Sequence, residues 1–491
     1  MKRISAQFLL LALLAPTIWA ATAEQAMILE DCTLAGSLGI ARIEARCGSF
    51  TRPEDPADPD STPIFLKVAV IPSLSPEPQP DAFTVINGGP GGSSLDLYAD
   101  SARIFSTILR ERDIVVLDQR GTGASNPLDC PELEAANFEY TPELIQASTR
   151  ACLADLSAAP QFYTTSVAVQ DLEALRIALG YTRLNVYGVS YGTRVAQHYT
   201  RRFPASVRTL IIDGVAPPQV PLGPNAALNA QRTLDRLFAR CAGDNACAGS
   251  FPDLEANLTA LSDRLQAGPV DLEVAHPTTG IRESVSLNYT HLLLTLRMLS
   301  YAPETASLLP LIITEAEENG NFTPLASSAL RIETELRGGI RFGMHNSVVC
   351  AEDVPFFGDL DIAALEQTYI GPEQVQSLQA ICELWPRGPV DEDLREPLTV
   401  PVPTLILSGE EDPITPPAYG ELAHESLPNS IHLVGTGQGH GVMSRGCFPR
   451  LISEFVDSGS LESLDTSCID RLTHQPFFLN LMGPVSASST P

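Results

Sequence analysis

The sequence predicts an α/β protein with a mostly parallel, twisted sheet, helices on both faces of the sheet and an inserted, mainly helical lid. Short, almost continuous apolar runs, typical of strands buried on both faces, alternate with amphipathic helical patterns. In the clearest helical pattern Leu172, Leu175 and Leu179 share one face, Ser166 can cap the start and Gly180 the end. The runs that predict strands are residues 64–71, 83–86, 113–118, 184–189, 208–214, 403–409 and 430–435.

The predicted strands leave a long gap in the middle of the chain. Residues 216–400 have the pattern of amphipathic helices, and proline-rich segments stand at both ends of this interval. We therefore expect one core formed by the flanking segments, with the lid inserted between them. The expected organisation is a signal peptide at 1–23, the first part of the core at 24–215, the lid at 216–400 and the second part of the core at 401–491.

The charge balance is strongly acidic. The 491 residues include 59 acidic and 31 basic side chains, which gives a formal net charge of -28. Such a charge repels the phosphates of nucleic acids and anionic membranes, so we expect no nucleic-acid partner. Lysine occurs only at Lys2 and Lys67, and arginine does not deprotonate in proteins, which argues against a lysine nucleophile.

The first residues have the pattern of a cleaved secretory signal. Lys2 and Arg3 precede an apolar stretch, and small residues up to Ala23 provide a cleavage site. Pro16 interrupts the apolar stretch, which is too short to span a bilayer. We expect export to the periplasm or the medium, with no membrane attachment after cleavage.

Cysteine usage fits export. The ten cysteines form an even set beyond the signal, which favours disulfides, and the absence of a Cys-x-x-Cys pair argues against a metal site. The sequence leaves the pairing open, with sequential neighbours as the simplest pattern. The residues are Cys32, Cys47, Cys130, Cys152, Cys241, Cys247, Cys350, Cys382, Cys447 and Cys468.

A serine between two glycines stands where a predicted strand meets a predicted helix. In "GVSYG", residues 188–192, Ser190 follows the strand 184–189, and a helical pattern follows it. Alone the motif is weak evidence, but a strand–turn–helix context exposes such a serine at the carboxyl edge of a sheet. The glycines avoid side-chain collisions in so sharp a turn. We predict that Ser190 is a nucleophile.

A serine nucleophile needs a histidine base and a carboxylate that orients it, here expected in the order acid then histidine. Asp412 follows the strand 403–409, and His440 follows the strand 430–435 on a glycine-rich loop. We predict that these two residues complete a triad with Ser190. Rival acids are Glu410, Glu411 and Asp213, of which Asp213 better suits a structural turn.

A glycine-rich loop, "INGGPGGSS" at residues 86–94, directly follows an early strand. Backbone N–H groups in such a loop can stabilise a developing oxyanion. We predict that the N–H groups of Gly89 and Tyr191 form the oxyanion hole. The alternatives are a plain loop and a phosphate-binding loop, but the latter lacks the Gly-Lys-Ser/Thr ending.

Together "NGGPGG", "DQRGTGAS", "GVSYGT", "DPITP" and "GHG" resemble the proline iminopeptidase and tripeptidyl aminopeptidase group of the α/β-hydrolases, with a tripeptidyl aminopeptidase-like C-terminal segment. The resemblance implies a serine peptidase that removes short units from free peptide N-termini, with a lid that shapes the pocket. It also implies the disulfides Cys130–Cys152, Cys350–Cys382 and Cys447–Cys468. One departure is Asn87, where proline iminopeptidases have histidine, so strict proline preference is not implied.

In the family, lid carboxylates hold the α-ammonium of the substrate. This lid offers Glu352 and Asp353 for that role, and the alternative is a solvated acidic turn beside a disulfide. Asp118 and Arg120 fit a turn that braces the core, and His345 fits a structural role. No metal or organic cofactor is called for.

The leading hypothesis is an exported serine aminopeptidase acting on peptides with a free N-terminus. A carboxylesterase of small esters is the alternative, because the same triad serves both leaving groups. A non-catalytic binding protein of the same fold is a third possibility, disfavoured by the complete Ser-Asp-His set.

Overall fold

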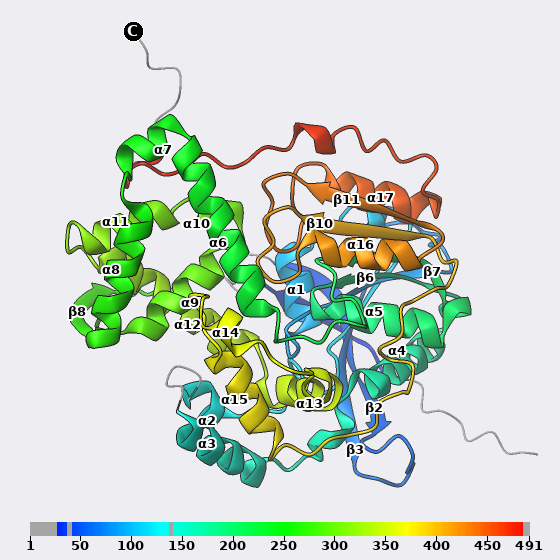
Figure 1. Ribbon diagram of the computed structural model, residues 1–491. Helices are drawn as coiled ribbons and strands as arrows, with labels where there is room; N and C mark the ends of the chain where they lie inside the picture. The colour runs from blue at the N-terminus through cyan, green and yellow to red at the C-terminus, as the bar shows by residue number, and fades with distance from the viewer. Residues whose placement is uncertain (1–26, 37–41, 137–140, 485–491) are drawn as a thin grey trace, which may run out of the picture.

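A computed structural model describes residues 27–36, 42–136 and 141–484, so the predicted signal peptide lies outside the described residues. Nine strands of these ranges form one sheet in the order β1-β2-β3-β5-β4-β6-β7-β10-β11 (Figure 1). Six neighbouring strands of this sheet are parallel to one another: β5, β4, β6, β7, β10 and β11. The strands β1, β2 and β3 add antiparallel pairs at one edge. Their bounds are β1 Glu30–Ala35, β2 Arg42–Pro53, β3 Pro63–Ile71, β4 Ala82–Ile86, β5 Ile114–Leu117, β6 Leu184–Val189, β7 Val207–Asp213, β10 Thr404–Gly409 and β11 Ser430–Gly435.

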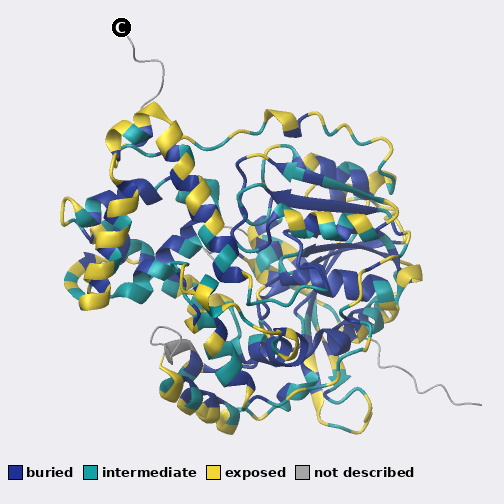
Figure 2. Cartoon of the chain, viewed as in Figure 1, coloured by how far each residue is buried: buried dark blue, intermediate teal, exposed yellow. Residues whose placement is uncertain are grey.

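Helices cover both faces of this sheet. Successive strand residues point to opposite faces, so each apolar strand presents apolar side chains to the helices on both sides. In β7, Leu210 and Ile212 pack into one apolar cluster with α4, α5 and α16, whereas Ile211 packs into another with α1 and α17. The central strands β6 and β10 are buried along almost their whole length (Figure 2). The helices of the core are α1 Ser94–Ser101, α2 Pro131–Ala136, α3 Pro142–Asp155, α4 Thr165–Leu179, α5 Tyr191–Arg202, α16 Pro417–Ser426 and α17 Phe448–Ser458.

All seven predicted strands are present, and the predicted α/β architecture is confirmed. Sequence analysis missed β1 and β2, which form the exposed edge of the sheet. Most residues of both strands are exposed or half-buried, and in β2 only Ala45 and Phe50 are buried, so neither strand has the continuous apolar run of a central strand.

The lid lies beside the sheet and is mainly helical (Figure 1). It also contains a two-stranded hairpin, β8 and β9, which sequence analysis did not predict. Its strands alternate exposed residues with partly or fully buried ones, so they lack the continuous apolar run by which the strands of the sheet were predicted. The elements are α6 Ala226–Gly243, α7 Asn245–Ser250, α8 Leu254–Ala267, β8 Val270–Ala275, β9 Arg282–Leu287, α9 Tyr289–Leu299, α10 Pro303–Ala306, α11 Leu309–Glu317, α12 Thr323–Gly339, α13 Phe342–Glu352, α14 Ile362–Leu365 and α15 Glu373–Cys382.

Residues 216–400 do not pack as one unit. Residues between 234 and 332 contribute to a separate hydrophobic core. In contrast, Met344 and Val348 of α13 pack into the main core under the sheet, and α15 packs against α3 (Figure 1). The helix α13 therefore joins the lid to the sheet rather than belonging to the lid alone.

The chain after α17 returns to the lid across the top of the view in Figure 1. Phe477 is buried in the core of the lid, and the Arg240 guanidinium stacks on its ring at 3.7 Å from the centroid. The N–H of Phe478 donates to the carbonyl of Ser307 at 3.2 Å. These contacts tie the last described segment to the lid.

Disulfides join all ten cysteines as sequential pairs, as the simplest pattern predicted. The three pairs implied by the family resemblance are among them. The bonds are Cys32–Cys47, Cys130–Cys152, Cys241–Cys247, Cys350–Cys382 and Cys447–Cys468.

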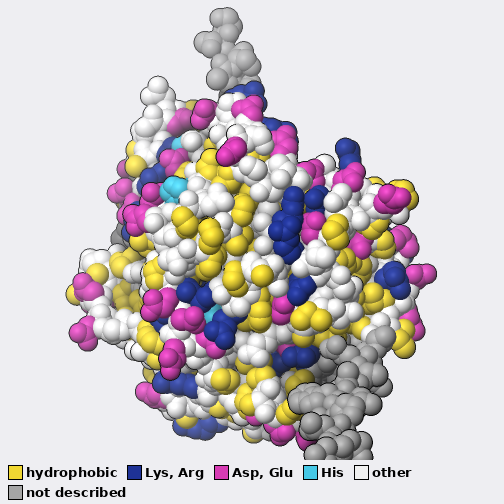
Figure 3. Space-filling view, turned by 90° about the vertical axis from the view of Figure 1, so that its right-hand side faces the viewer, with side chains coloured by type: hydrophobic (Ala, Val, Ile, Leu, Met, Phe, Trp, Pro, Cys, Tyr) yellow, Lys and Arg dark blue, Asp and Glu magenta, His cyan; other side chains and the backbone are white. Residues whose placement is uncertain are grey.

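The surface is acidic in total, yet acidic and basic side chains are interspersed on the face of the molecule shown in Figure 3. That face carries no broad basic patch of the kind that binds nucleic acid. Across the described ranges, no helix combines the length and apolar character that crossing a bilayer requires.

A buried ion pair braces the turn after β5. The Arg120 guanidinium, 1% exposed, binds both oxygens of Asp171 on α4 at 2.7 and 3.0 Å and donates to the carbonyls of Glu54 and Phe162. Nearby, the buried Asp118 carboxylate holds the start of α1 through the Leu95 N–H at 3.0 Å. Both residues thus brace the core.

We expect Arg120→Met to destabilise the protein by about 2–4 kcal/mol, because the buried Asp171 carboxylate then keeps only the partly exposed Arg52 as a charged partner. Urea denaturation followed by circular dichroism measures this change. Arg150→Met, which removes an exposed arginine on α3, is the matched control and should change the free energy of unfolding by less than about 0.5 kcal/mol. Equal stabilities of the two variants would contradict the bracing role.

Candidate active site

Ser190 sits in a strained turn between β6 and α5. Its φ of 58° and ψ of -128° place a non-glycine residue in a sparsely populated backbone region, which is a feature of functional sites. A Cβ at Gly188 would collide with the carbonyl of Gly192, and a Cβ at Gly192 would collide with the carbonyl of Ile86 on β4. The two glycines therefore allow the turn that lifts Ser190 to the end of the sheet.

Asp412 and His440 lie on the loops after β10 and β11 and are paired. Nδ1 of His440 is 2.8 Å from Oδ2 of Asp412. The Asp412 carboxylate also accepts the N–H of Ile414 at 2.9 Å and both the N–H and hydroxyl of Thr415 at 2.8 Å. Because the Asp412 side chain is fully buried, these donors stabilise its charge in place of water.

The electrostatics of the site favour a basic imidazole. Burial acts to lower the pKa of His440, but the charge and hydrogen bond of Asp412 and the charge of Asp213 outweigh it, so the pKa is raised above 6.5. The positive charge of Arg297 opposes this rise. Of the rival acids, none of Glu410, Glu411 and Asp213 shares a described hydrogen bond with the imidazole, and Asp412 does.

Asp213 organises the site without contacting the imidazole. Its carboxylate, buried at the end of β7, accepts the N–H groups of Val442 and Met443 at 2.9 Å and the Tyr187 hydroxyl at 2.8 Å. Burial raises the pKa of Asp213 to about 6, although these hydrogen bonds lower it. The group thereby fixes the loop that carries His440.

Ser190 and His440 lie at the same edge of the sheet. The N–H of Ser190 donates to the carbonyl of Asp213 at 2.9 Å. The next residue, Gly214, faces the imidazole, since a Cβ there would lie 3.2 Å from Cε1 of His440. Within the described contacts no hydrogen bond joins the Ser190 hydroxyl to His440, so proton transfer between them stays a prediction.

The glycine-rich loop passes directly over Ser190. A Cβ at Gly88 would collide with the Cβ of Ser190, so only glycine permits this approach. The Gly88 N–H donates to Oδ1 of Asn87 at 2.7 Å, which leaves the neighbouring Gly89 as the candidate donor on this loop. Tyr191 is the first residue of α5, where helix N–H groups lack intrahelical acceptors. The oxyanion hole of Gly89 and Tyr191 stays a prediction.

The lid contacts both the glycine-rich loop and the histidine. Ile340 forms an isolated bridge with Gly92, and the N–H of Arg341 donates to the carbonyl of Gly91 at 3.1 Å. The Tyr301 carbonyl accepts the N–H of His440 at 2.8 Å, and the two rings lie 5.0 Å apart.

Sequence reasoning did not identify Tyr301 or Thr415 as residues of the site. For Thr415 a signal existed, because it lies three residues after Asp412 in the quoted "DPIT" stretch, where a hydroxyl can reach back to the carboxylate. For Tyr301 the sequence gives no signal, because its position depends on how the lid folds over the sheet.

Glu352 and Asp353, predicted to bind the substrate ammonium, are both fully buried, so the alternative of a solvated acidic turn is wrong. Glu352 accepts the N–H and hydroxyl of Thr165 at 2.7 and 2.8 Å, and Thr165 also bonds the Tyr191 hydroxyl at 2.7 Å. Asp353 binds the Arg194 guanidinium at 2.9 Å. Both carboxylates thus hold α4 and α5, and their contact with substrate stays a prediction.

Burial raises the pKa of Glu352 to about 7, with the Arg194 charge and the Thr165 N–H acting in the opposite direction. The hydrogen-bonded path from Glu352 through Thr165 ends at the Tyr191 side chain, next to Ser190. This path therefore links the Glu352 carboxyl group to the side chain of the residue whose N–H is a candidate oxyanion donor.

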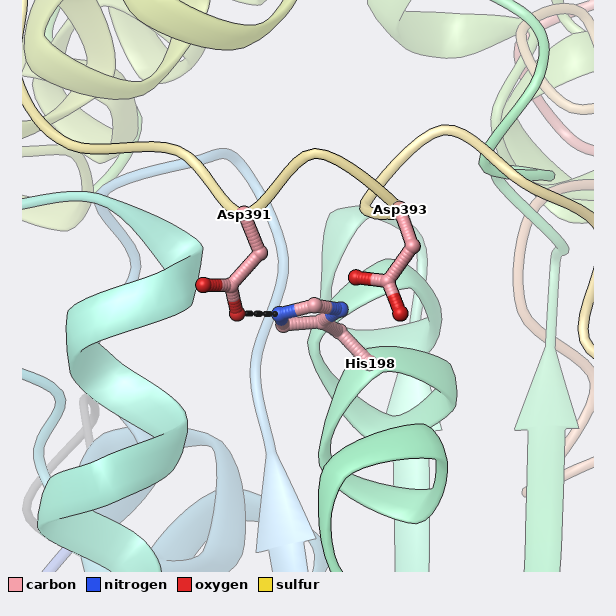
Figure 4. Close-up of side chains that lie close together, drawn as sticks. All are labelled: His198, Asp391 and Asp393. Carbon is pink, nitrogen blue, oxygen red and sulfur yellow. Dashed lines mark hydrogen bonds and ion pairs between the residues drawn. The ribbon is translucent and has the colours of Figure 1, made fainter.

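Two clusters of possible metal ligands occur among the described residues, and neither contains Ser190, Asp412 or His440. In Figure 4, His198 of α5 lies between Asp391 and Asp393, with Nε2 at 2.8 Å from Asp391. Arg202 is 3.5 Å from the same carboxylate, so an arginine already compensates its charge. The second cluster, Glu410, Glu411 and His474, is likewise paired with Arg236.

The fold and this arrangement of serine elbow, acid–histidine pair and glycine-rich loop define the α/β-hydrolase class. In comparisons with known proteins, residues 81–296 match the family described as "alpha/beta hydrolase fold". Residues 367–468 match the family described as "TAP-like protein".

Three curated relatives are similar to the chain. Serine protease Hip1 of Mycobacterium tuberculosis is 25% identical over 86% of this chain and 87% of the relative. Tripeptidyl aminopeptidase of Streptomyces lividans is 30% identical over 38% of each chain. Probable proline iminopeptidase of Streptomyces coelicolor is 32% identical over 38% of this chain and 47% of the relative.

The two family matches together assign the chain to the α/β-hydrolase superfamily, and its relatives support a serine peptidase that is similar to proline iminopeptidases and tripeptidyl aminopeptidases.

The raised pKa of His440 sets the expected pH dependence. A general base must be neutral, so the rate should fall as the pH falls through a midpoint above 6.5. The pH profile of kcat/KM measures this midpoint. His424→Gln, which changes a half-buried histidine of α16, is the control and should leave the midpoint unchanged. A midpoint below 6.5 would contradict the pairing of His440 with Asp412.

Proposed function

We propose that the protein is an exported serine aminopeptidase that releases short N-terminal units from peptides through an acyl-enzyme on Ser190. The observation that carries the proposal is the strained turn at Ser190, beside the loop of the paired Asp412 and His440. Relatives of the chain include a tripeptidyl aminopeptidase and a probable proline iminopeptidase, which supports the aminopeptidase type.

In the proposed reaction the Ser190 hydroxyl oxygen attacks the scissile carbonyl carbon while its proton passes to Nε2 of His440. The N–H groups of Gly89 and Tyr191 stabilise the resulting oxyanion. Collapse breaks the C–N bond, and the leaving amine takes the proton from His440. Water then hydrolyses the acyl-enzyme by the same steps, releasing the N-terminal unit and restoring Ser190.

Asp412 keeps its charge through this cycle. Its carboxylate holds the Nδ1–H of His440 and stabilises the imidazolium that forms, while the N–H groups of Ile414 and Thr415 fix the carboxylate. Thr415 donates its hydroxyl to the same carboxylate and so limits its rotation.

Export is part of the proposal. Five disulfides among the described residues suit an oxidising compartment such as the periplasm or the medium. The predicted signal at residues 1–23 is consistent with this, and fractionation of expressing cells tests it.

The losses of kcat caused by single substitutions at the reacting groups should not be additive. We expect Ser190→Ala and His440→Ala each to lower kcat by about 10⁴–10⁶-fold, and the double variant little further, because the two groups act as a unit. Ser106→Ala, at an exposed serine, is the control. A double variant whose loss equals the product of the single losses would mean that His440 is not the base for Ser190.

Digestion of a peptide library with analysis by mass spectrometry tests the mode of cleavage. We expect cleavage close to free N-termini, and at least about tenfold slower release from N-acetylated copies of the same peptides. Equal rates on blocked and free peptides would contradict aminopeptidase action. Turnover of p-nitrophenyl acetate without any peptide cleavage would favour the carboxylesterase alternative.

A further inference from the structure

A path of buried hydrogen bonds joins the Glu352 carboxylate to the hydroxyl of Tyr191. Thr165, the first residue of α4, donates its N–H to Oε1 of Glu352 at 2.7 Å and its hydroxyl to Oε2 at 2.8 Å. The Thr165 oxygen also lies 2.7 Å from the Tyr191 hydroxyl, and the Gln119 amide donates to that hydroxyl at 3.2 Å. The exposed fractions of Glu352, Thr165 and Tyr191 are all at most 1%, so water does not compete for these bonds.

The chemistry of its two ends fixes the direction of this path. An ionised carboxylate can only accept, so the Thr165 hydroxyl gives its one proton to the bond with Glu352. The Thr165 oxygen must then accept the hydroxyl proton of Tyr191, whose oxygen in turn accepts from Gln119. Each donor along the path therefore has an acceptor only while both side-chain oxygens of Glu352 accept.

Tyr191 connects this path to the reacting serine. It directly follows Ser190 and opens α5, where helix N–H groups lack intrahelical acceptors. The Ser190 backbone is strained, and such a conformation persists only where the surrounding contacts enforce it. The anchored side chain of Tyr191 is one of these contacts, so a shift of its hydroxyl would also move the backbone N–H of the same residue.

The helix that carries Glu352 also holds the other half of the candidate oxyanion hole. The helix α13 ends at Glu352, and the N–H of Arg341, just before its first residue, donates to the carbonyl of Gly91 at 3.1 Å. Its 11 residues span about 16 Å at a rise of about 1.5 Å each. One rigid helix thus holds the glycine-rich loop at one end and, through Thr165, Tyr191 at the other.

We propose that Glu352 is a positioning residue of the reaction, which sets the place of the Tyr191 N–H in the oxyanion hole through Thr165. This inference rests on the proposed function and deepens it, because it makes the rate depend on a carboxylate outside the triad. Such a role differs in its kinetics from binding of a substrate ammonium. A group that orients an oxyanion donor acts on every substrate, including one without an ammonium.

Two substitutions interrupt the path at different points. Glu352→Gln keeps the shape of the side chain but replaces one acceptor oxygen with an NH₂ group, which would face a donor of Thr165. If the Thr165 hydroxyl turns to accept from this group, its proton points at Tyr191, and the tyrosine hydroxyl loses its acceptor. Thr165→Val removes the middle of the path and retains the buried carboxylate, whereas Thr165→Ser keeps the hydroxyl.

The test measures the hydrolysis of p-nitrophenyl acetate, which has no ammonium, at about pH 8, above the raised pKa of Glu352. We expect Glu352→Gln and Thr165→Val each to lower kcat by about 10–100-fold, because a misplaced oxyanion donor costs less than a missing one. KM should change by less than about threefold. The double variant should lose little more than either single variant, and Thr165→Ser should retain most of the wild-type kcat.

Inhibition by phenylboronic acid, which forms a tetrahedral adduct with a reactive serine, gives a second measurement. The inhibition constant should rise by about tenfold or more in Glu352→Gln, because the oxyanion hole stabilises tetrahedral states above all. Glu173→Gln is the matched control, since Glu173 accepts the Tyr199 hydroxyl at 2.7 Å near the opposite end of α5. It should change kcat and the inhibition constant by less than about twofold.

The outcomes separate the inference from the proposed function. Wild-type kcat in Glu352→Gln, or an equal loss in Glu173→Gln, overturns the positioning role alone. So does a loss confined to KM for peptides with a free N-terminus, which would assign Glu352 to substrate binding. If circular dichroism shows that Glu352→Gln does not fold, Thr165→Val against Thr165→Ser decides.

The wild type tests the function itself. Turnover of neither the ester nor any peptide overturns the proposed function, and the inference fails with it. Turnover of the ester without cleavage of peptides overturns the aminopeptidase assignment alone, and the ester rates of the variants still decide the role of Glu352.

Discussion

The close approach of β4, β6 and α5 is the constraint on which the site depends. The turn at Ser190 brings these backbones so near that glycine is required at Gly188 and Gly192, and the Gly88 backbone covers Ser190 from the other side. Because no side chain intervenes, the hydroxyl, the helix N-terminus and the glycine-rich loop occupy one small volume. Every other residue of the site is positioned relative to this turn.

Asp213 shows how a buried charge can position a site without taking part in it. Its backbone carbonyl binds the Ser190 N–H, while its carboxylate holds the loop of His440. Asp213 thereby fixes the position of the Ser190 turn relative to the loop that carries His440. The cost is a desolvated carboxylate with a raised pKa, partly offset by its hydrogen-bond donors.

Periodicity and local motifs predicted the central strands, the serine turn and the pairing of Asp412 with His440, because each follows directly from a buried run and the loop after it. The exposed edge strands and the lid hairpin lacked that signal. The burial of Glu352 and Asp353 could not be predicted either, since an acidic pair is typical of a surface turn. Only the packing of its helix against the sheet shows that the pair is buried. The place of Tyr301 in the site could not be predicted either, because it depends on the path that the lid takes over the sheet.

The lid is part of the site's geometry as well as a cover over it. Tyr301 binds the backbone of His440, and Arg341 binds the glycine-rich loop, so both sides of Ser190 are held by residues that precede β10 in the chain. Rearranging the lid to accept a different peptide would therefore shift the base and the loop together. For this reason changes in the lid are expected to alter reactivity and substrate choice at once, which links the two properties through shared backbone hydrogen bonds.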